Sequence, residues 1–318
     1  MKALVCGSMA FDTIMVFPDK FGNHILPDKV HMLNVSFLVP ELRREFGGCA
    51  GNIAYNMALL GAPGAPMATV GQDFGAYADW MDKTNVSREY LTTISDAYTG
   101  QAYINTDMDD NQITAFHPGA MGESHQNKVP TDAGITLGIV SPDGRDGMIQ
   151  HAEQFAGAGI PFIFDPGQGL PMFDGTDLRK FIDEASWVTV NDYECELLKE
   201  RTGWSEAEIA EQVRALVVTR GGEGSTIYQD GQEPLVIPNA TPAQLADPTG
   251  CGDAYRAGLI YGLMHDLDWA TTGRIASLMG CIKIEQAGTQ NHSFTLAEFA
   301  ARYEAEFGDA FPNVTAAA

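Results

Sequence analysis

Short apolar segments alternate with helical patterns along most of this chain, and this alternation constrains its fold more than any other feature. Strands that alternate with helices form βαβ units, in which the strands are parallel and helices cover both faces of the sheet. The sequence therefore predicts an α/β protein whose ligands gather at the carboxyl ends of the strands. We expect buried strands at 3–6, 67–70, 135–140, 162–164, 188–190 and 216–219, and helices at 144–156, 192–202 and 254–265.

Two segments interrupt this pattern. Residues 13–46 and 98–118 lack helical periodicity, and the second of them carries alternating stretches at 101–105 and 112–116. Alternation with a period of two is typical of strands with one buried face. These two segments therefore predict a separate β-structure next to the main sheet.

The composition excludes several classes of protein. The chain has 318 residues, 45% of them hydrophobic, and its 19 basic and 42 acidic side chains give a formal charge of −23, which opposes binding to nucleic acid. Its five cysteines are scattered without a C-x-x-C pair, which argues against a disulfide framework or a zinc site. No apolar run reaches the length of a membrane span and no signal peptide is recognisable, so we expect a cytoplasmic protein without membrane partners.

The segment 247–258, DPTGCGDAYRAG, has the features of a phosphoryl-transfer site. Gly250 and Gly252 expose backbone amides around Cys251, and a following helix would add the positive end of its dipole, so the turn favours an anion. Asp253 at this junction could accept the proton of an attacking hydroxyl group. The simpler alternative is an aspartate that only caps a helix.

A second segment, 47–61, pairs a glycine turn with an asparagine at the start of an apolar helix, GGCAGNIAYNMALLG. Together the two segments resemble the ribokinase-like (PfkB) family, which reads GG-x-x-x-N-x-A near its N-terminal third and D-T-x-G-x-GD near its C-terminal third. Pro248 replaces the more common threonine, and Cys251 stands where a smaller residue is usual. Neither change removes the carboxylate or the glycines.

The resemblance implies a three-layer α/β/α sandwich with a small β-sheet lid over the acceptor. Residues 1–12, 47–97 and 119–318 would form the core, and residues 13–46 and 98–118 the lid. It also implies ATP-dependent phosphorylation of an alcohol, with a lid that excludes water from the reacting groups.

The family's acceptor-binding positions match four residues of this chain: Asp12, Gly47, Gly48 and Asn52. We expect the Asp12 carboxylate to project from the end of the first strand and to bind a pair of hydroxyl groups. Asp12 as a turn residue and Asn52 as a helix cap are the alternatives for each residue taken alone.

Within the family, the chain is most similar to bacterial adenosine kinases. The segment 116–121, the Tyr-Arg pair after Asp253 and the GTQ at 288–290 carry this resemblance. It implies that Phe116 stacks on a purine and that Ser8, Ser36 and Gln168 contact the nucleoside. The acceptor would be adenosine, and the alternatives are inosine, guanosine, ribose or a ketohexose such as fructose. A protein that binds such ligands without catalysis is a further alternative.

The nucleotide side is predicted from two segments that follow strands. Asn191 and Glu194 match the family's N-x-x-E motif, in which the glutamate organises Mg²⁺ through water. The alternative for Glu194 is a first-turn helix carboxylate. The loop 219–224 resembles the family's ATP-phosphate loop, and its expected contacts are Thr219, Gly221, Gly222 and Gly224.

The predicted mechanism is in-line transfer of the ATP γ-phosphoryl group to a primary alcohol. Asp253 would be the base, the amides of Gly250, Cys251 and Gly252 the anion hole, and Arg256 would steady the transferring group from the next helical turn. The resemblance also allows a monovalent cation such as K⁺ near Gly288 and a homodimer formed through the lid.

Overall fold

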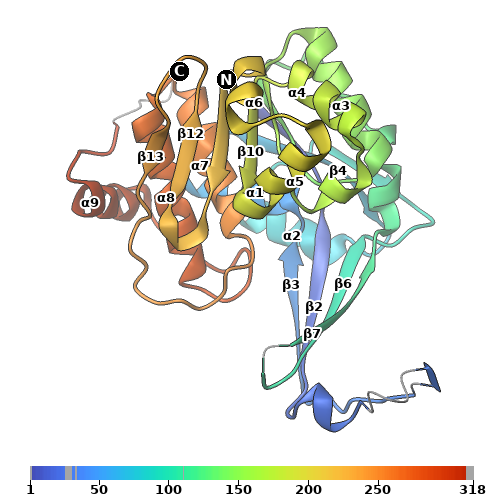
Figure 1. The fold of residues 1–318 in the computed structure, drawn as a ribbon. Helices are drawn as coiled ribbons and strands as arrows, with labels where there is room; N and C mark the ends of the chain where they lie inside the picture. Colours follow the sequence, from blue (N-terminus) through green and yellow to red (C-terminus); the bar gives the residue numbers. More distant parts are fainter. Residues whose placement is uncertain (1, 26–30, 33, 110, 313–318) are drawn as a thin grey trace.

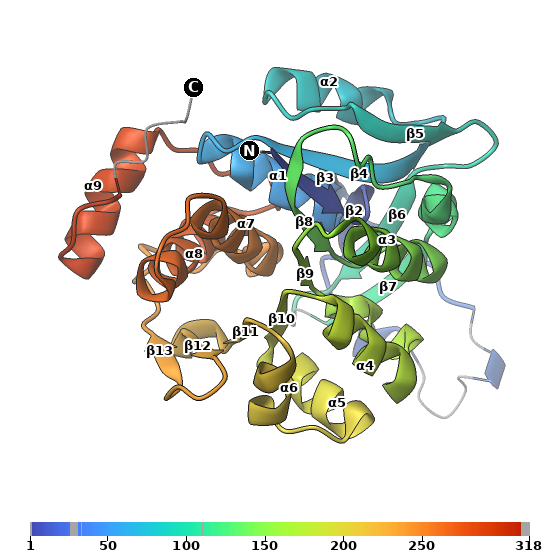
Figure 2. The same ribbon diagram turned by 90° about the horizontal axis from the view of Figure 1, so that it is seen from above.

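The computed structural model describes residues 2–25, 31–32, 34–109 and 111–312, and within them the core is a nine-stranded sheet. Its order is β13-β12-β11-β10-β9-β8-β1-β4-β5, and every pair is parallel except those made by β12 and β13 (Figure 2). The expected mostly parallel sheet is confirmed. Its strands are β1 (Lys2–Cys6), β4 (Gly64–Gly71), β5 (Tyr90–Ile94), β8 (Ile135–Val140), β9 (Phe162–Phe164), β10 (Trp187–Asn191), β11 (Ala215–Thr219), β12 (Ser225–Tyr228) and β13 (Leu235–Ile237).

Helices cover both faces of this sheet, because alternate residues of each central strand point to opposite sides. In β1, Ala3 and Val5 pack into one apolar cluster with α1, α2, α7, α8 and α9, whereas Leu4 and Cys6 pack into another with α3, α4, α5 and α6. The three-layer α/β/α arrangement is thereby confirmed. The helices are α1 (Cys49–Leu59), α2 (Gly75–Lys83), α3 (Arg145–Ala158), α4 (Gly175–Glu184), α5 (Asp192–Thr202), α6 (Glu206–Gln212), α7 (Cys251–Met264), α8 (Trp269–Ile284) and α9 (Leu296–Phe307).

A second sheet of four strands, in the order β3-β2-β6-β7, projects from the core as a lid (Figure 1). Its strands are β2 (Ala10–Val16), β3 (Glu41–Gly47), β6 (Gly100–Thr106) and β7 (Gln112–His117). It is built from the two segments that interrupt the βαβ pattern, as expected. One detail differs: β2 already begins at Ala10, so Asp12 lies within a lid strand and not at the carboxyl end of the first core strand.

The chain connects the lid to the core through glycine. Gly48 has a φ of 87°, and a Cβ there would lie 2.5 Å from the carbonyl oxygen of Ser8. Only glycine fits this close approach. The turn carries the chain from β3 directly into α1 and thereby places the start of that helix beside the lid. None of the described helices combines the length and apolar composition that crossing a membrane requires.

Candidate active site

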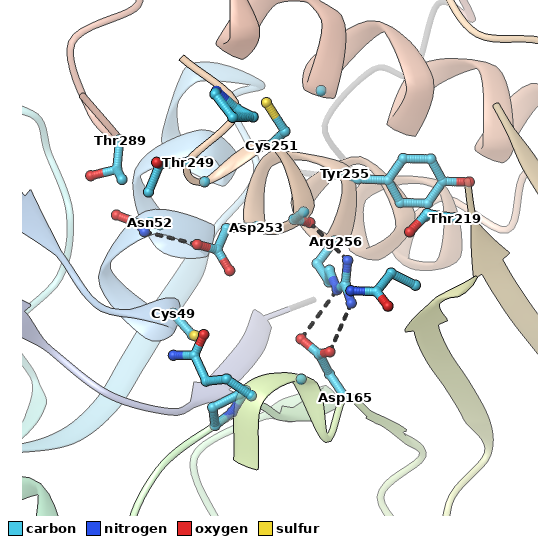
Figure 3. A pocket seen from close by; sticks show the side chains of 18 of the residues that line it. Cys49, Asn52, Asp165, Thr219, Thr249, Cys251, Asp253, Tyr255, Arg256 and Thr289 are labelled. Carbon is cyan, nitrogen blue, oxygen red and sulfur yellow. Dashed lines mark hydrogen bonds and ion pairs between the residues drawn. The ribbon is translucent and has the colours of Figure 1, made fainter. Parts of the chain in front are cut away.

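A cavity of about 1160 Å³ opens where the carboxyl ends of the core strands meet the lid. Most of its lining comes from loops that follow strands and from the first turns of α1 and α7 (Figure 3). This is the location that the parallel topology predicts for a ligand.

Asp253 and Asn52 face each other in this cavity, although they lie 201 positions apart in the chain. Asp253 occupies the first turn of α7, and its Oδ2 accepts a hydrogen bond of 2.8 Å from Asn52 Nδ2 of α1 (Figure 3). Burial raises the pKa of Asp253 to about 6, against the opposing effect of the Asn52 hydrogen bond. A carboxylate with this pKa is ionised at neutral pH and is a stronger base than a solvated one.

The turn before α7 has the geometry of an anion site. Gly250 has a φ of 81° and caps the helix, so the backbone turns sharply at the positive end of a 14-residue helix dipole. The amide of Cys251, however, already donates to the carbonyl oxygen of Pro248 at 3.1 Å. Of the three predicted anion-hole amides it is therefore the least available, which leaves Gly250 and Gly252. Burial raises the pKa of the Cys251 thiol to about 11, so it stays protonated at neutral pH.

Arg256 lies in the cavity wall but is bound to a carboxylate that the sequence analysis missed. Its Nη2 and Nε donate to the two carboxylate oxygens of Asp165 at 2.9 and 3.2 Å, and both side chains are buried (Figure 3). Glu194 Oε2 lies 4.0 Å from the same guanidinium group. Asp165 directly follows β9, at the carboxyl end of a core strand, where a parallel sheet is expected to bind its ligands.

The structure brings most of the predicted acceptor residues together. Six of them line the cavity. Gly47 is not part of the lining, but it precedes Gly48, and a Cβ at Gly47 would come within 2.6 Å of Asp12 Oδ2. Ser36 is exposed in the segment before β3 and is not part of the cavity lining, so its contact with the nucleoside stays a prediction. Burial and the neighbouring Glu45 raise the pKa of Asp12 to about 6. The six lining residues are Ser8, Asp12, Gly48, Asn52, Phe116 and Gln168.

The nucleotide-side residues line the same cavity: Asn191, Glu194, Thr219, Gly221, Gly222 and Gly224. Asn191 and Glu194 also form a reciprocal capping box at the start of α5, with hydrogen bonds of 2.7 and 2.8 Å. The capping alternative is therefore present in the structure, alongside the cavity position. Among the described residues no three His, Cys, Asp or Glu side chains cluster as a metal cage. A single carboxylate such as Glu194 fits Mg²⁺ that keeps most of its water and phosphate ligands.

The region expected to hold a monovalent cation contains the positively charged ammonium group of a lysine. Lys283, near the end of α8, is fully buried, and its ammonium group donates to the carbonyl oxygens of Asp247 at 2.7 Å and of Gln286 at 3.1 Å. Burial lowers the pKa of this lysine. Since these carbonyls already accept from the ammonium group, the residues present do not fit an additional cation at the same carbonyls.

Comparison with known proteins places this geometry in a family. Residues 13–295 match the family described as pfkB family carbohydrate kinase. The chain belongs to the pfkB family of carbohydrate kinases. It is therefore a phosphotransferase with an alcohol group as acceptor, as the two glycine motifs predicted.

Relatives of this pfkB family member include enzymes of known structure. A Burkholderia thailandensis nucleoside kinase, solved in complex with inosine, is 52% identical with a TM-score of 0.88, and the match covers 97% of this chain and 99% of that one. A Methanocaldococcus jannaschii nucleoside kinase structure is 27% identical with a TM-score of 0.87, over 96% and 99% of the two chains. A nucleoside kinase of Methanothermobacter thermautotrophicus is 29% identical over 310 residues, which are 96% of each chain.

Proposed function

We propose that this enzyme transfers the γ-phosphoryl group of ATP to the 5′-hydroxyl group of a purine nucleoside, with adenosine as the expected acceptor. The observation that carries the proposal is the position of Asp253. It lies in one continuous cavity whose lining includes both the glycine loop of residues 219–224 and the lid residues Asp12 and Phe116. A base between a phosphate loop and a lid is the arrangement that in-line transfer requires.

In the proposed reaction, Asp253 accepts the proton of the 5′-hydroxyl group as the oxygen attacks the γ-phosphorus. Asn52 holds the carboxylate in place through its 2.8 Å hydrogen bond. The amides of Gly250 and Gly252 and the α7 dipole stabilise the charge on the transferring group. Mg²⁺, which Glu194 would help to hold through water, neutralises charge on the phosphates when it is bound. Arg256, which its ion pair with Asp165 holds in the cavity wall, would steady the transferring group.

A nucleoside acceptor is supported by both the lid and the relatives. Phe116 on β7 is 53% exposed and lines the cavity, so its ring is available to stack on a flat base. Asp12 on the neighbouring part of the lid sheet could bind two ribose hydroxyl groups. The Burkholderia thailandensis nucleoside kinase has been solved with inosine and with ADP-inosine, which favours a purine nucleoside and makes inosine the main alternative to adenosine.

The Asp253→Asn variant tests the assigned base. It keeps the shape of the side chain but removes its ability to accept a proton, so kcat should fall by about two to four decades, the usual range for a positioned general base. The measurement is ADP release with ATP, Mg²⁺ and adenosine.

A matched control is Asp146→Asn. Asp146 is also an aspartate in the first turn of a helix, α3, but it is exposed and outside the cavity lining. Its replacement should leave kcat unchanged. Turnover of Asp253→Asn at the wild-type rate would remove Asp253 from the role of base.

A further inference from the structure

A chain of hydrogen bonds runs from α2 to the catalytic carboxylate. Trp80 Nε1 donates to Gln290 Oε1 at 2.9 Å, and Gln290 Nε2 donates to Asn52 Oδ1 at 3.0 Å. Asn52 Nδ2 then donates to Asp253 Oδ2 at 2.8 Å. Gln290 and Asn52 are each at most 4% exposed, so water does not compete for these groups.

The chemistry of Trp80 fixes the direction of this chain. An indole N–H can only donate, so the Gln290 atom that faces it has to be the amide oxygen. The Gln290 nitrogen then faces Asn52 and has to donate, which assigns the oxygen of Asn52 to that contact. The Asn52 nitrogen is therefore left to face Asp253. One donor-only group thus orients two amides, which could otherwise flip.

A second contact supports the same orientation of Gln290 independently. The Tyr77 hydroxyl group donates its single proton to the carbonyl oxygen of Gly47 at 2.8 Å. It can therefore only accept from its other neighbour, Gln290 Nε2, at 2.7 Å. In a flipped Gln290, the amide N–H groups would face the N–H group of Trp80, donor against donor. The amide oxygen would then face the Tyr77 hydroxyl group, which could donate to it only by giving up its hydrogen bond to Gly47, the last residue of lid strand β3.

We propose that Trp80 and Gln290 are positioning residues for phosphoryl transfer, which act through Asn52 to present an N–H donor to the Asp253 carboxylate. The inference rests on the proposed role of Asp253 as base. A donor in this position favours the ionised carboxylate over the protonated acid and holds it in one orientation. If Asn52 were free to flip, its oxygen could face Asp253 instead, and the ionised carboxylate would be disfavoured.

A packing role for Trp80 has to be separated from this positioning role. Its ring stacks on Phe46 with centroids 5.5 Å apart and on Tyr55 with centroids 6.1 Å apart. Trp80→Phe retains an aromatic ring for these contacts and removes the N–H group. The variant therefore isolates the hydrogen bond that orients Gln290.

The experiment compares Trp80→Phe with the wild-type enzyme over a range of pH. We expect kcat at neutral pH to fall about three- to tenfold. This is the loss expected when the hydrogen bond from Asn52 to the charged carboxylate is no longer held in place by Trp80 and Gln290. The acidic limb of the kcat profile should move to higher pH, while the KM values for ATP and acceptor stay within about twofold. The pKa of the Asp253 carboxyl group can be measured directly by ¹³C NMR, with Asp253→Asn used to assign its signal. This pKa should also be higher in Trp80→Phe than in the wild type.

Two further variants sharpen the test. Trp204→Phe is the control, because Trp204 is also half-buried but packs in the other apolar cluster, and its profile should match the wild type. Gln290→Leu breaks the chain at its centre and should shift the acidic limb further. Adding Trp80→Phe to Gln290→Leu should then cause no additional shift, since Trp80 acts only through Gln290. If Gln290→Leu does not fold, the pH profile of Trp80→Phe alone still tests the proposed positioning role.

An acidic limb and an Asp253 titration that coincide in Trp80→Phe and wild type would overturn the inference. A fall in kcat at all pH values alike would also overturn it, since that result indicates altered packing only. The proposed function fails separately, if the wild-type enzyme phosphorylates no nucleoside. In that case the ¹³C titration still tests the hydrogen-bond chain, because it requires no turnover.

Discussion

At the scale of single residues, the chemistry centres on the environment of the Asp253 carboxylate. Burial raises its pKa to about 6, the Asn52 hydrogen bond lowers it, and the charges of Asp165 and Arg256 act in opposite directions. Within the bidentate pair, Asp165 therefore opposes the effect of Arg256 on the pKa of the base. What remains is a carboxylate that is ionised at neutral pH and still basic enough to accept a proton.

This environment predicts the pH dependence of turnover. The proposed reaction needs the ionised carboxylate, so kcat should be constant near neutral pH and should fall tenfold per pH unit once the pH drops below a value of about 6. The measurement is kcat at saturating ATP and acceptor from about pH 5 to about pH 9. The pKa of Asp12 is also raised to about 6. Asp12 is expected to act on acceptor binding, so its titration should affect KM for the acceptor more than kcat at saturating acceptor. A kcat that does not change between about pH 5 and neutral would contradict the assignment.

The residues found from the sequence and those missed differ in a physical way. Asp253 and Asn52 follow glycine turns at helix starts, so local patterns identify them. Gln290 belongs to the GTQ segment that carries part of the family resemblance, but the sequence analysis assigned it no role. Its partner Trp80 lies 210 positions away, and their hydrogen bond exists only because the folded chain brings α2 next to the segment after α8. No local pattern in the sequence encodes such a pair. Ser36 shows the converse, because a single matching serine did not bring that residue into the cavity lining.

At the scale of elements, the site depends on two helix N-termini that meet. The first turns of α1 and α7 carry Asn52 and Asp253, and each helix begins directly after a glycine with positive φ, Gly48 or Gly250. Two hydrogen bonds hold the loop before α7 in place. The Asp247 carboxylate accepts from the Gly288 amide at 2.9 Å, and the Asp247 carbonyl oxygen accepts from the Lys283 ammonium group. The ammonium group of Lys283 therefore joins the loop before α7 to the loop after α8.

This built-in cation leads us to predict that the enzyme needs no added K⁺. Wild-type activity should be the same in K⁺ as in a bulky monovalent cation at equal ionic strength. Lys283→Met removes the ammonium group while keeping the length of the side chain, and it leaves the carbonyl oxygens of Asp247 and Gln286 without this donor. The free energy of unfolding should fall by about 1–3 kcal/mol, and kcat should fall because the anion-site loop loses its support.

K⁺ should restore part of the lost activity in Lys283→Met, since the freed carbonyls could bind it. Denaturant unfolding and kcat in the two salts provide the measurements. Activation of the wild-type enzyme by K⁺ over the bulky cation would contradict the prediction.

The central strands were predictable because they are buried on both faces, and α5 because its start carries a capping pattern. The runs at 135–140 and 162–164 coincide with β8 and β9, and the helix at 192–202 coincides with α5, whose capping box fixes its start. Strands β12 and β13 were not predicted. They are antiparallel strands of only four and three residues, too short to give a clear apolar pattern, and β13 has no partner on its outer side. The early start of β2 was also missed, because its pairing with β3 and β6 depends on distant strands.

At the scale of the whole molecule, function depends on one cavity shared by the core and the lid. The core supplies the proposed base and the glycine loops, whereas the lid strands supply Asp12 and Phe116. The lid strands project from the core, and the ring of Phe116 is exposed in this structure (Figure 1). Closure over a bound acceptor would bury this ring and exclude water from the phosphoryl group.

The central claim is that the acceptor is a purine nucleoside and not a free sugar. The most direct test is to incubate the enzyme with ATP, Mg²⁺ and an equimolar mixture of adenosine, inosine, guanosine, ribose and fructose, and to identify the phosphorylated products by mass spectrometry. We predict that nucleoside 5′-monophosphates form first, with AMP as the main product. Phosphorylation of ribose or fructose ahead of every nucleoside would contradict the account, although the enzyme would remain a kinase of the same family.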